Sequence, residues 1–301
     1  MNLSAATMAW RDQGHHVTVG DLQVFVRTRG HRDRPTVILI HGFPTSGFDW
    51  RDTMDLLADN FHCVAMDLPG FGLSDKPAAY SYSLFQQADT VEAVARALGI
   101  EAAHVVSHDM GTSLHTELLA RKHRSALGFT LLTSTFLNGS ILKTHAVLTD
   151  FQRMLETPSR LPEAAEVCAG LLPQYVAGLQ QLMARTEAVT EADALVMTEL
   201  MAHHDGHRRL PNVYAYVRER YLHQQRWLDA LTAESVSAPV QLVWATDDPV
   251  AVIGMGRALS ELAPQARFTE VPGVGHFLPI ESPGSIAEAV RAITAETGVL
   301  R

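Results

Sequence analysis

The sequence predicts an α/β protein with a mostly parallel sheet that is covered by helices on both faces and interrupted by a helical insertion. Short runs rich in β-branched residues recur along the chain, and amphipathic segments separate most of them. One interval, from about 136 to 230, contains no strand-like run. We therefore expect a main domain formed by 1–135 and 231–301, with a helical cap domain formed by 136–230.

The strands are expected in chain order. The segment "HHVTVGDLQVFVRTRG" predicts a hairpin of two strands around a turn at Gly20-Asp21. Six further runs complete an eight-stranded sheet: 35–40, 61–67, 104–107, 127–134, 239–245 and 266–271. The continuous apolar character of 35–40 and 61–67 is typical of strands buried on both faces. Amphipathic helices are expected at 84–99 and 285–298, and Pro162, Pro173 and Pro211 are expected to bound helices of the insertion.

Composition excludes several classes of function. Apolar residues make up 47% of the chain and the net charge is −9, which argues against nucleic-acid binding. The N-terminus has no signal-peptide pattern, and no apolar run of about 18 residues is present, so we expect a cytoplasmic protein without a membrane span. The cysteines, Cys63 and Cys168, are expected to be free thiols.

Two segments suggest a ligand but lack the required spacing. "HHDGH", 203–207, has no metal-ligand spacing and predicts a surface turn, so no metal site is expected. "DLPGFGLSDKP" contains glycines after a strand but no GK[ST], so no nucleotide cofactor is expected.

Ligands of parallel sheets bind beyond the carboxyl ends of the strands, so the residues that follow each strand are the candidates for chemistry. The run 35–40 is followed by His41-Gly42-Phe43-Pro44, a turn in which the Phe43 N–H can serve as one oxyanion donor. An ordinary strand-to-helix loop is the alternative.

The next candidate is "SHDMG", which comprises Ser107, His108, Asp109, Met110 and Gly111. Small residues flank a central aspartate, as in a nucleophile elbow, and the Met110 N–H would be the second oxyanion donor. A helix N-cap is the alternative role of Asp109. Ser107 is a rival nucleophile, although it would lie on the strand and not at the apex of the turn.

Two later strands supply the partners of a nucleophile. Asp247 and Asp248 follow 239–245, and either could orient a histidine; Asp248, next to Pro249, is favoured. His276 follows the last strand in "VPGVGHFLPIESP". The order nucleophile, acid, histidine is the chain order of α/β-hydrolases.

With "HGFPTSGFDW", "MDLPGFGLSDKP", "SHDMG", "DDPV" and "GHFLPIESP" in place, the chain resembles the α/β-hydrolase fold across nearly its whole length. The aspartate at the elbow resembles the epoxide hydrolase and haloalkane dehalogenase branch. The further motif "HDG…YVRER…RWLDAL" gives the nearest resemblance, to the mesoderm-specific-transcript-like hydrolases. The resemblance implies an Asp109 nucleophile, with Asp248 and His276 as its partners.

An aspartate at this place can displace at saturated carbon and form an alkyl ester, which His276 would then hydrolyse with water. Related dehalogenases hold the halide with a tryptophan and often an asparagine, at the positions that Met110 and Phe43 occupy here. Related epoxide hydrolases use cap tyrosines as proton donors; Tyr216 is the first candidate and Tyr214 the second. Tyr214 and Tyr221 would share a helix face, with Tyr216 pointing elsewhere.

Epoxide hydrolysis to a diol is therefore the favoured function, and a haloalkane dehalogenase or a non-catalytic ligand-binding member of the fold are the alternatives. The expected ligand is a small apolar organic molecule. Arg220 and Trp227 are expected to be surface charge and cap packing. The cap residues expected to line the pocket are Leu171, Leu172, Met197 and Met201.

Overall fold

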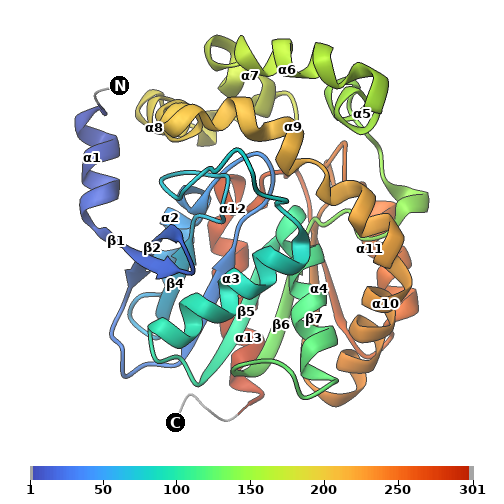
Figure 1. Cartoon of the computed structure of the whole chain (residues 1–301). Coiled ribbons are helices and arrows are strands. Elements are labelled where there is room, and N and C mark those ends of the chain that lie inside the picture. The colour runs from blue at the N-terminus through green and yellow to red at the C-terminus, as the bar shows by residue number, and fades with distance from the viewer. Residues whose placement is uncertain (1–2, 298–301) are drawn as a thin grey trace.

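The computed structural model describes residues 3–297 and contains one eight-stranded sheet in the order β1-β2-β4-β3-β5-β6-β7-β8 (Figure 1). The pairs β1-β2 and β2-β4 are antiparallel, and the other pairs are parallel. The expected fold class and all eight strands are confirmed, with these bounds: β1 Gly14–Val19, β2 Leu22–Arg29, β3 Thr36–Ile40, β4 His62–Met66, β5 Ala102–His108, β6 Thr130–Leu137, β7 Val240–Ala245 and β8 Arg267–Val271.

β3 is apolar from Val37 to Ile40 because both of its faces are buried. In β3, Val37 and Leu39 join one hydrophobic cluster, and Ile38 and Ile40 join another on the opposite side. Successive side chains of a strand point to opposite faces, so an unbroken apolar run indicates two covered faces.

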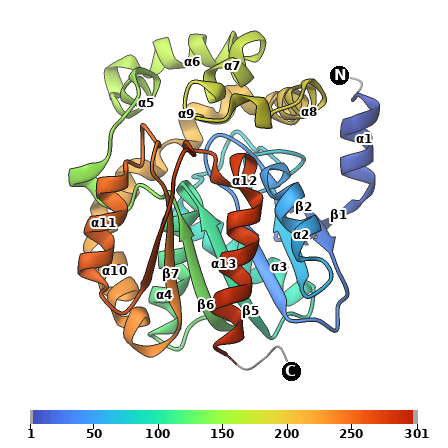
Figure 2. The ribbon, with the colours of Figure 1, turned by 180° about the vertical axis from the view of Figure 1, so that it is seen from behind.

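Helices cover both faces. α3, α4 and α10 lie on one face (Figure 1), and α2, α12 and α13 lie on the other (Figure 2). The helix expected at 285–298 corresponds to α13, and residue 298 lies outside the described residues. The bounds outside the insertion are α1 Ala5–Asp12, α2 Arg51–Leu57, α3 Leu84–Ala97, α4 Met110–Lys122, α10 Tyr216–Ser237, α11 Ile253–Leu262, α12 Leu278–Glu281 and α13 Pro283–Ala295.

A helical layer, defined here as residues 143–213, lies over the end of the sheet at which β5 and β3 finish (Figures 1 and 2). The expected domain boundaries do not coincide with the end of an element, since residue 136 falls inside β6 and residue 230 falls inside α10. Residues 1–2 and 298–301 of the expected main domain lie outside the described range. The layer comprises η2 Lys143–His145, α5 Asp150–Glu156, η3 Pro158–Arg160, α6 Leu161–Ala169, η4 Leu172–Gln174, α7 Tyr175–Gln180, η5 Thr186–Ala188, α8 Glu191–Ala202, η6 His203–Arg209 and α9 Leu210–Val213.

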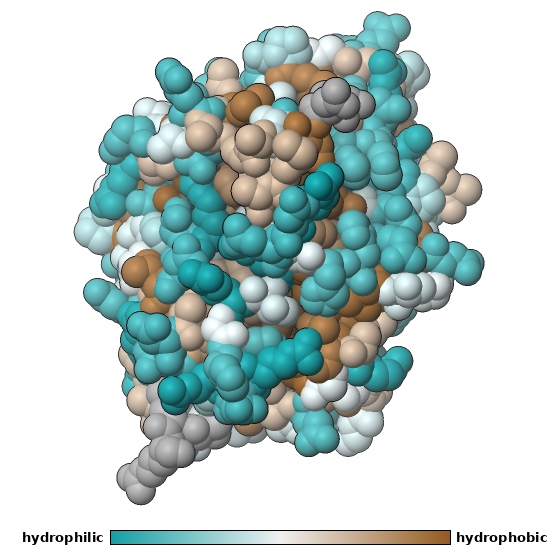
Figure 3. Space-filling model, turned by 90° about the vertical axis from the view of Figure 1, so that its left-hand side faces the viewer, coloured by the Kyte–Doolittle hydropathy of each residue, from teal (hydrophilic) through white to brown (hydrophobic). Residues whose placement is uncertain are grey.

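Hydrophilic residues cover most of the face seen in Figure 3, with smaller hydrophobic areas between them. Among residues 3–297, no helix combines the length and the apolar character needed to cross a bilayer. Cys63 and Cys168 are free and buried, as expected.

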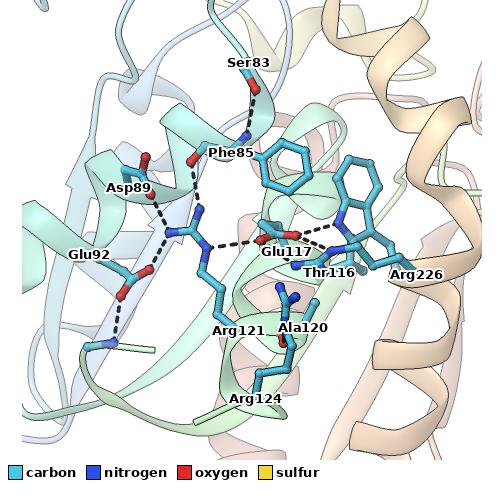
Figure 4. A network of polar contacts seen from close by, with 12 residues as sticks. Ser83, Phe85, Asp89, Glu92, Thr116, Glu117, Ala120, Arg121, Arg124 and Arg226 are labelled. Carbon is cyan, nitrogen blue, oxygen red and sulfur yellow. Dashed lines mark hydrogen bonds and ion pairs between the residues drawn. The ribbon is translucent and has the colours of Figure 1, made fainter. Parts of the chain in front are cut away.

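The long helix α10 connects the layer to the main domain and is anchored on α4 (Figure 4). The buried Glu117 of α4 accepts hydrogen bonds from Arg226 at 2.9 Å and 3.0 Å and from the indole of Trp227 at 2.9 Å. Arg121 donates to the same carboxylate at 3.1 Å. A buried charge is tolerated when it is paired and hydrogen-bonded, as Glu117 is here. The network therefore fixes the middle of α10 against α4.

Candidate active site

Asp109 stands at a sharp turn between β5 and α4. Its φ is +47°, in the left-handed region that L-residues rarely adopt, and its side chain makes no N-cap hydrogen bond to α4. The turn is closely packed, since a Cβ added to Gly42 would lie 2.5 Å from the Asp109 Cβ, and one on Gly111 would lie 2.7 Å from the carbonyl oxygens of β3 and His41. The strained, close-packed turn holds the Asp109 carboxylate away from its own helix and toward the Phe43 N–H and His276.

The HGFP turn provides a donor to this carboxylate. The backbone N–H of Phe43 donates to Asp109 Oδ2 at 2.8 Å. The ring of His41 supports the turn, since its Nε2 accepts from the Leu68 N–H at 3.0 Å and its Nδ1 therefore donates to the Gly42 carbonyl at 2.8 Å. Met110 begins α4 directly after Asp109 and is buried.

His276 lies between the two aspartates that follow β5 and β7. Its Nδ1 is 2.7 Å from Asp248 Oδ2, and its Nε2 is 3.8 Å from Asp109 Oδ1. Asp247 is exposed and accepts a hydrogen bond from its neighbour Thr246. Of the two candidate acids, the structure therefore brings Asp248 to the histidine.

The Asp248 carboxylate is fully hydrogen-bonded. Besides His276, it accepts from Asn138 Nδ2 at 2.8 Å and from the backbone N–H groups of Val250 and Ala251 at 2.7 Å and 2.9 Å. Sequence reasoning missed Asn138. The signal was present, since Asn138 directly follows a strand, β6, as the other site residues do.

The charges of this pair stabilise one another. Burial works against the charged forms, but the charge and hydrogen bond of His276 and the other donors lower the pKa of Asp248. Burial also disfavours the charged form of His276. The charge and hydrogen bond of Asp248, followed by the charge of Asp109, outweigh this effect and raise the pKa of His276 to about 9. The value of about 6.5 expected for an unperturbed histidine therefore does not apply to this site.

His41 and His108, the other two histidines of the motif loops, are uncharged and hold the backbone of the site in place. Burial lowers the pKa of both His41 and His108 to about 4. His108 Nε2 lies 2.8 Å from the backbone carbonyl of His276 and, as a donor, fixes that backbone position.

Two tyrosines, Tyr214 directly after α9 and Tyr216 at the start of α10, reach the HGFP turn. The ring centre of Phe43 lies 5.2 Å from that of Tyr214 and 6.0 Å from that of Tyr216, and the tyrosine rings are 5.5 Å apart. The expectation that Tyr216 points away from Tyr214 is wrong, because α9 ends at Val213 and α10 begins at Tyr216. The helical spacing used for that expectation does not continue through the break.

Arg220 was expected on the surface and is instead buried, with 2% of its surface exposed. Its guanidinium carbon lies 4.9 Å from the ring centre of Tyr216, and its Nε donates to Ser113 Oγ at 2.7 Å. A cation over a desolvated aromatic ring is stabilising, so Arg220 holds the Tyr216 ring as well as α4. Trp227 is buried as expected.

A cavity of about 490 Å³ leads from the layer to His276 and Phe43. Apolar side chains line it, including the expected Leu171, together with glutamine amides and the polar side chains of Thr149, Asp150 and Tyr175. Met197 and Met201 line a smaller neighbouring cavity with Asp49 and Tyr175, while Leu172 packs against the core without lining either. The cavity next to His276 suits an apolar molecule with a few polar groups.

The segment 203–207 forms part of η6, and His207 within it is buried, so the expectation of a solvated turn is only partly met. Within residues 3–297, no group of three or more His, Cys, Asp or Glu side chains is arranged to hold a metal ion.

Two relatives are similar over most of the chain. LipZ of Mycobacterium tuberculosis is 36% identical, covering 97% of this chain and 99% of the relative. The mesoderm-specific transcript homolog protein of Homo sapiens is 32% identical, covering 82% of this chain and 75% of the relative. The resemblance to mesoderm-specific-transcript proteins expected from the sequence is thereby confirmed.

Solved structures agree on the fold. A haloalkane dehalogenase DbeA loop variant from Bradyrhizobium elkanii is 24% identical with a TM-score of 0.77, covering 95% of this chain and 97% of its own. The epoxide hydrolase CorEH is 19% identical with a TM-score of 0.74, covering 94% and 98%. The family model described as alpha/beta hydrolase fold matches residues 35–283. The chain, with its eight-stranded sheet and its aspartate at the turn after β5, belongs to the α/β-hydrolase superfamily.

Proposed function

We propose that this protein hydrolyses a small apolar organic substrate through a covalent ester on Asp109, and that the reaction is epoxide hydrolysis to a diol. One observation carries the proposal: the Asp109 carboxylate faces His276 Nε2 at 3.8 Å while the Phe43 N–H donates to its other oxygen at 2.8 Å. A carboxylate nucleophile beside a histidine and an oxyanion donor supports ester formation followed by ester hydrolysis.

In the first half-reaction, Asp109 Oδ1 attacks a carbon of the epoxide ring. The new C–O bond forms as the ring C–O bond breaks, and the ring oxygen takes a proton from one of the two tyrosines that contact Phe43, with Tyr216 as first candidate and Tyr214 as second. Asp109 Oδ2 stays on the Phe43 N–H and becomes the carbonyl oxygen of the ester. The tyrosinate regains its proton from water.

In the second half-reaction, neutral His276 takes a proton from water as the resulting hydroxide adds to the Asp109 carbonyl carbon. The N–H groups of Phe43 and Met110 stabilise the oxyanion. The intermediate then collapses, and the alcohol oxygen leaves and takes the proton from His276. Asp109 keeps the hydroxyl that came from water and loses its proton to the hydroxide left when the tyrosinate was reprotonated, so it regains its carboxylate. Asp248 stabilises the imidazolium during the transfer, since it lies 2.7 Å from Nδ1.

The expected result for Tyr216→Phe is a fall of about 10²- to 10³-fold in the rate of ester formation from an epoxide, as is typical when a general acid is lost. Burial and then the charge of Asp109 raise the pKa of Tyr216 well above its usual value, while Arg220 opposes them and supports proton donation. Quenched single turnovers, followed by mass spectrometry of the Asp109 peptide, measure this rate.

Tyr214→Phe tests the second candidate in the same way, since the Tyr214 ring also contacts Phe43. The rate of ester formation from a bromoalkane should be unchanged in either variant, because bromide needs no proton to leave. An unchanged epoxide rate in both variants and in the double variant would remove the tyrosines from the mechanism.

The proposal is tested by a single turnover in H₂¹⁸O with excess enzyme and styrene oxide. We expect diol formation with ¹⁸O in the Asp109 carboxylate, because water attacks the aspartyl carbonyl and not the substrate. Diol without label in Asp109 would show direct attack by water. Turnover of a brominated alkane alone would assign the dehalogenase reaction, and tight binding without turnover would assign the binding alternative.

A further inference from the structure

Glu281 is a buried carboxylate, 5% exposed, in the short helix that follows His276. Its Oε2 accepts backbone N–H bonds from Ala184 at 2.8 Å, Arg185 at 2.9 Å and Gly275 at 2.9 Å. Its Oε1 accepts from the Phe277 N–H at 3.1 Å. Four donors satisfy most of the acceptor capacity of an ionised carboxylate, and they come from two parts of the chain.

Two of the donors flank His276, and the other two belong to the helical layer. Ala184 and Arg185 lie between α7 and α8, whereas Gly275 and Phe277 are the immediate neighbours of the histidine. One side chain therefore joins the loop that carries His276 to the layer above it.

The same contact is reinforced by the backbone. The His276 N–H donates to the Leu182 carbonyl at 2.8 Å, and Arg185 Nε donates to the Gly273 carbonyl at 2.9 Å. The approach is so close that a Cβ on Gly275 would lie 2.6 Å from both the Ala184 nitrogen and the Leu182 carbonyl oxygen. Glycine is needed here because the layer occupies the space of a side chain.

We infer that Glu281 is a positioning residue, which sets the position of His276 through the layer segment 182–185. The inference rests on the proposed function, because it assigns Glu281 to one of its two half-reactions. Ester formation depends on Asp109 and Phe43, which Glu281 does not touch. Ester hydrolysis depends on His276, whose loop Glu281 holds, so the contact controls the second half-reaction alone.

The test is Glu281→Gln, which keeps the size of the side chain but replaces one acceptor oxygen with an NH₂ group that faces backbone donors. We expect ester formation within about threefold of the wild-type rate and ester hydrolysis slower by about 10- to 100-fold, the scale of a small misplacement of a catalytic group. The Asp109 ester of styrene oxide should then accumulate in rapid-quench samples analysed by mass spectrometry.

Glu199→Gln is the matched control. Glu199 is also buried, and it holds α8 of the layer to the N-terminal helix by accepting from the Ser4 N–H and hydroxyl at 2.9 Å and 2.8 Å, far along the chain from His276. We expect both half-reactions of this variant to be unchanged. A second readout is the downfield proton resonance of the His276–Asp248 hydrogen bond, which should shift in Glu281→Gln and stay unchanged in Glu199→Gln.

A parallel fall in both half-reactions of Glu281→Gln, or equal effects in the two glutamine variants, would overturn the inference. If Glu281→Gln does not fold, Gly275→Ala is the second variant, because its added Cβ pushes the His276 loop away from the layer segment 182–185. The Asp109 ester should accumulate in this variant too, and a wild-type ratio of the two rates would also overturn the inference. If the wild-type protein forms no Asp109 ester, the proposed function fails, and that outcome is distinct from either result.

Discussion

Asp109→Ala is expected to abolish turnover, with a fall in kcat on the order of 10⁴- to 10⁶-fold, which is the range for loss of a group on which the covalent step depends. No other described side chain receives the Phe43 N–H and faces His276 Nε2. Steady-state diol formation measures the loss, and thermal unfolding monitors the fold. Alanine is preferred to asparagine, because an amide beside His276 could itself be hydrolysed to the carboxylate.

Ser107→Ala is the control for this variant, because Ser107 is the rival nucleophile. Its hydroxyl is buried and lies 2.9 Å from His115 Nδ1, with the Thr135 carbonyl at 3.4 Å. We expect Ser107→Ala to keep the covalent ester on Asp109. Full activity in Asp109→Ala together with an inactive Ser107→Ala would assign an acyl-enzyme reaction on the serine.

His276→Gln is expected to stop the reaction at the ester. Asp109 should still be alkylated, but no base would remain for water, so steady-state turnover should fall on the order of 10⁴-fold or more while one equivalent of ester accumulates. Mass spectrometry of the intact protein detects the adduct. His104→Gln is a matched control, since His104 is a buried strand histidine that hydrogen-bonds Thr133 instead of the site.

The wild-type pH profile follows from the same residue. His276 has a raised pKa of about 9 in the free enzyme and must be neutral to accept a proton, so ester hydrolysis should speed up as the pH rises. Esterification removes the charge of Asp109, one of the causes of the raised pKa, so the midpoint of the hydrolysis step should lie below 9. Asp248→Asn should lower the midpoint further, and rapid-quench rates across pH check both shifts.

A loss of alkylation in His276→Gln would contradict the assignment of His276 to the second half-reaction. A hydrolysis rate that falls with rising pH would contradict its action as a base.

The sheet could be predicted because burial on both faces leaves a simple signature in strands such as β3 and β7. Asp109 and His276 could be proposed as site residues for a similar reason, since each directly follows a strand and parallel strands end at one edge. Asp247 and Asp248 follow the same strand, so only their exposure in the fold separates them.

Other features depend on tertiary contacts that have no periodic signal. Arg220 is buried because Tyr216 and Ser113 surround it, and both of these contacts require the placement of α10. The neighbouring rings of Tyr214 and Tyr216 depend on the break between α9 and α10. The raised pKa of His276 depends on a carboxylate 28 positions away in the chain that only folding brings near.

The 22 residues of α10 form one continuous helix that begins at Tyr216 and is held at Trp227 by Glu117. Eleven residues separate these points, which is about 16 Å along the axis. A second contact holds α10 on α4 nearer its start, since Arg220 Nε donates to Ser113 Oγ at 2.7 Å. A tilt of α10 by about 5° about the Glu117 contact would strain that second contact and move Tyr216 by about 1.4 Å. Substitutions around Glu117, remote from the cavity, are therefore a route by which the position of Tyr216, and with it the range of substrates, can be altered.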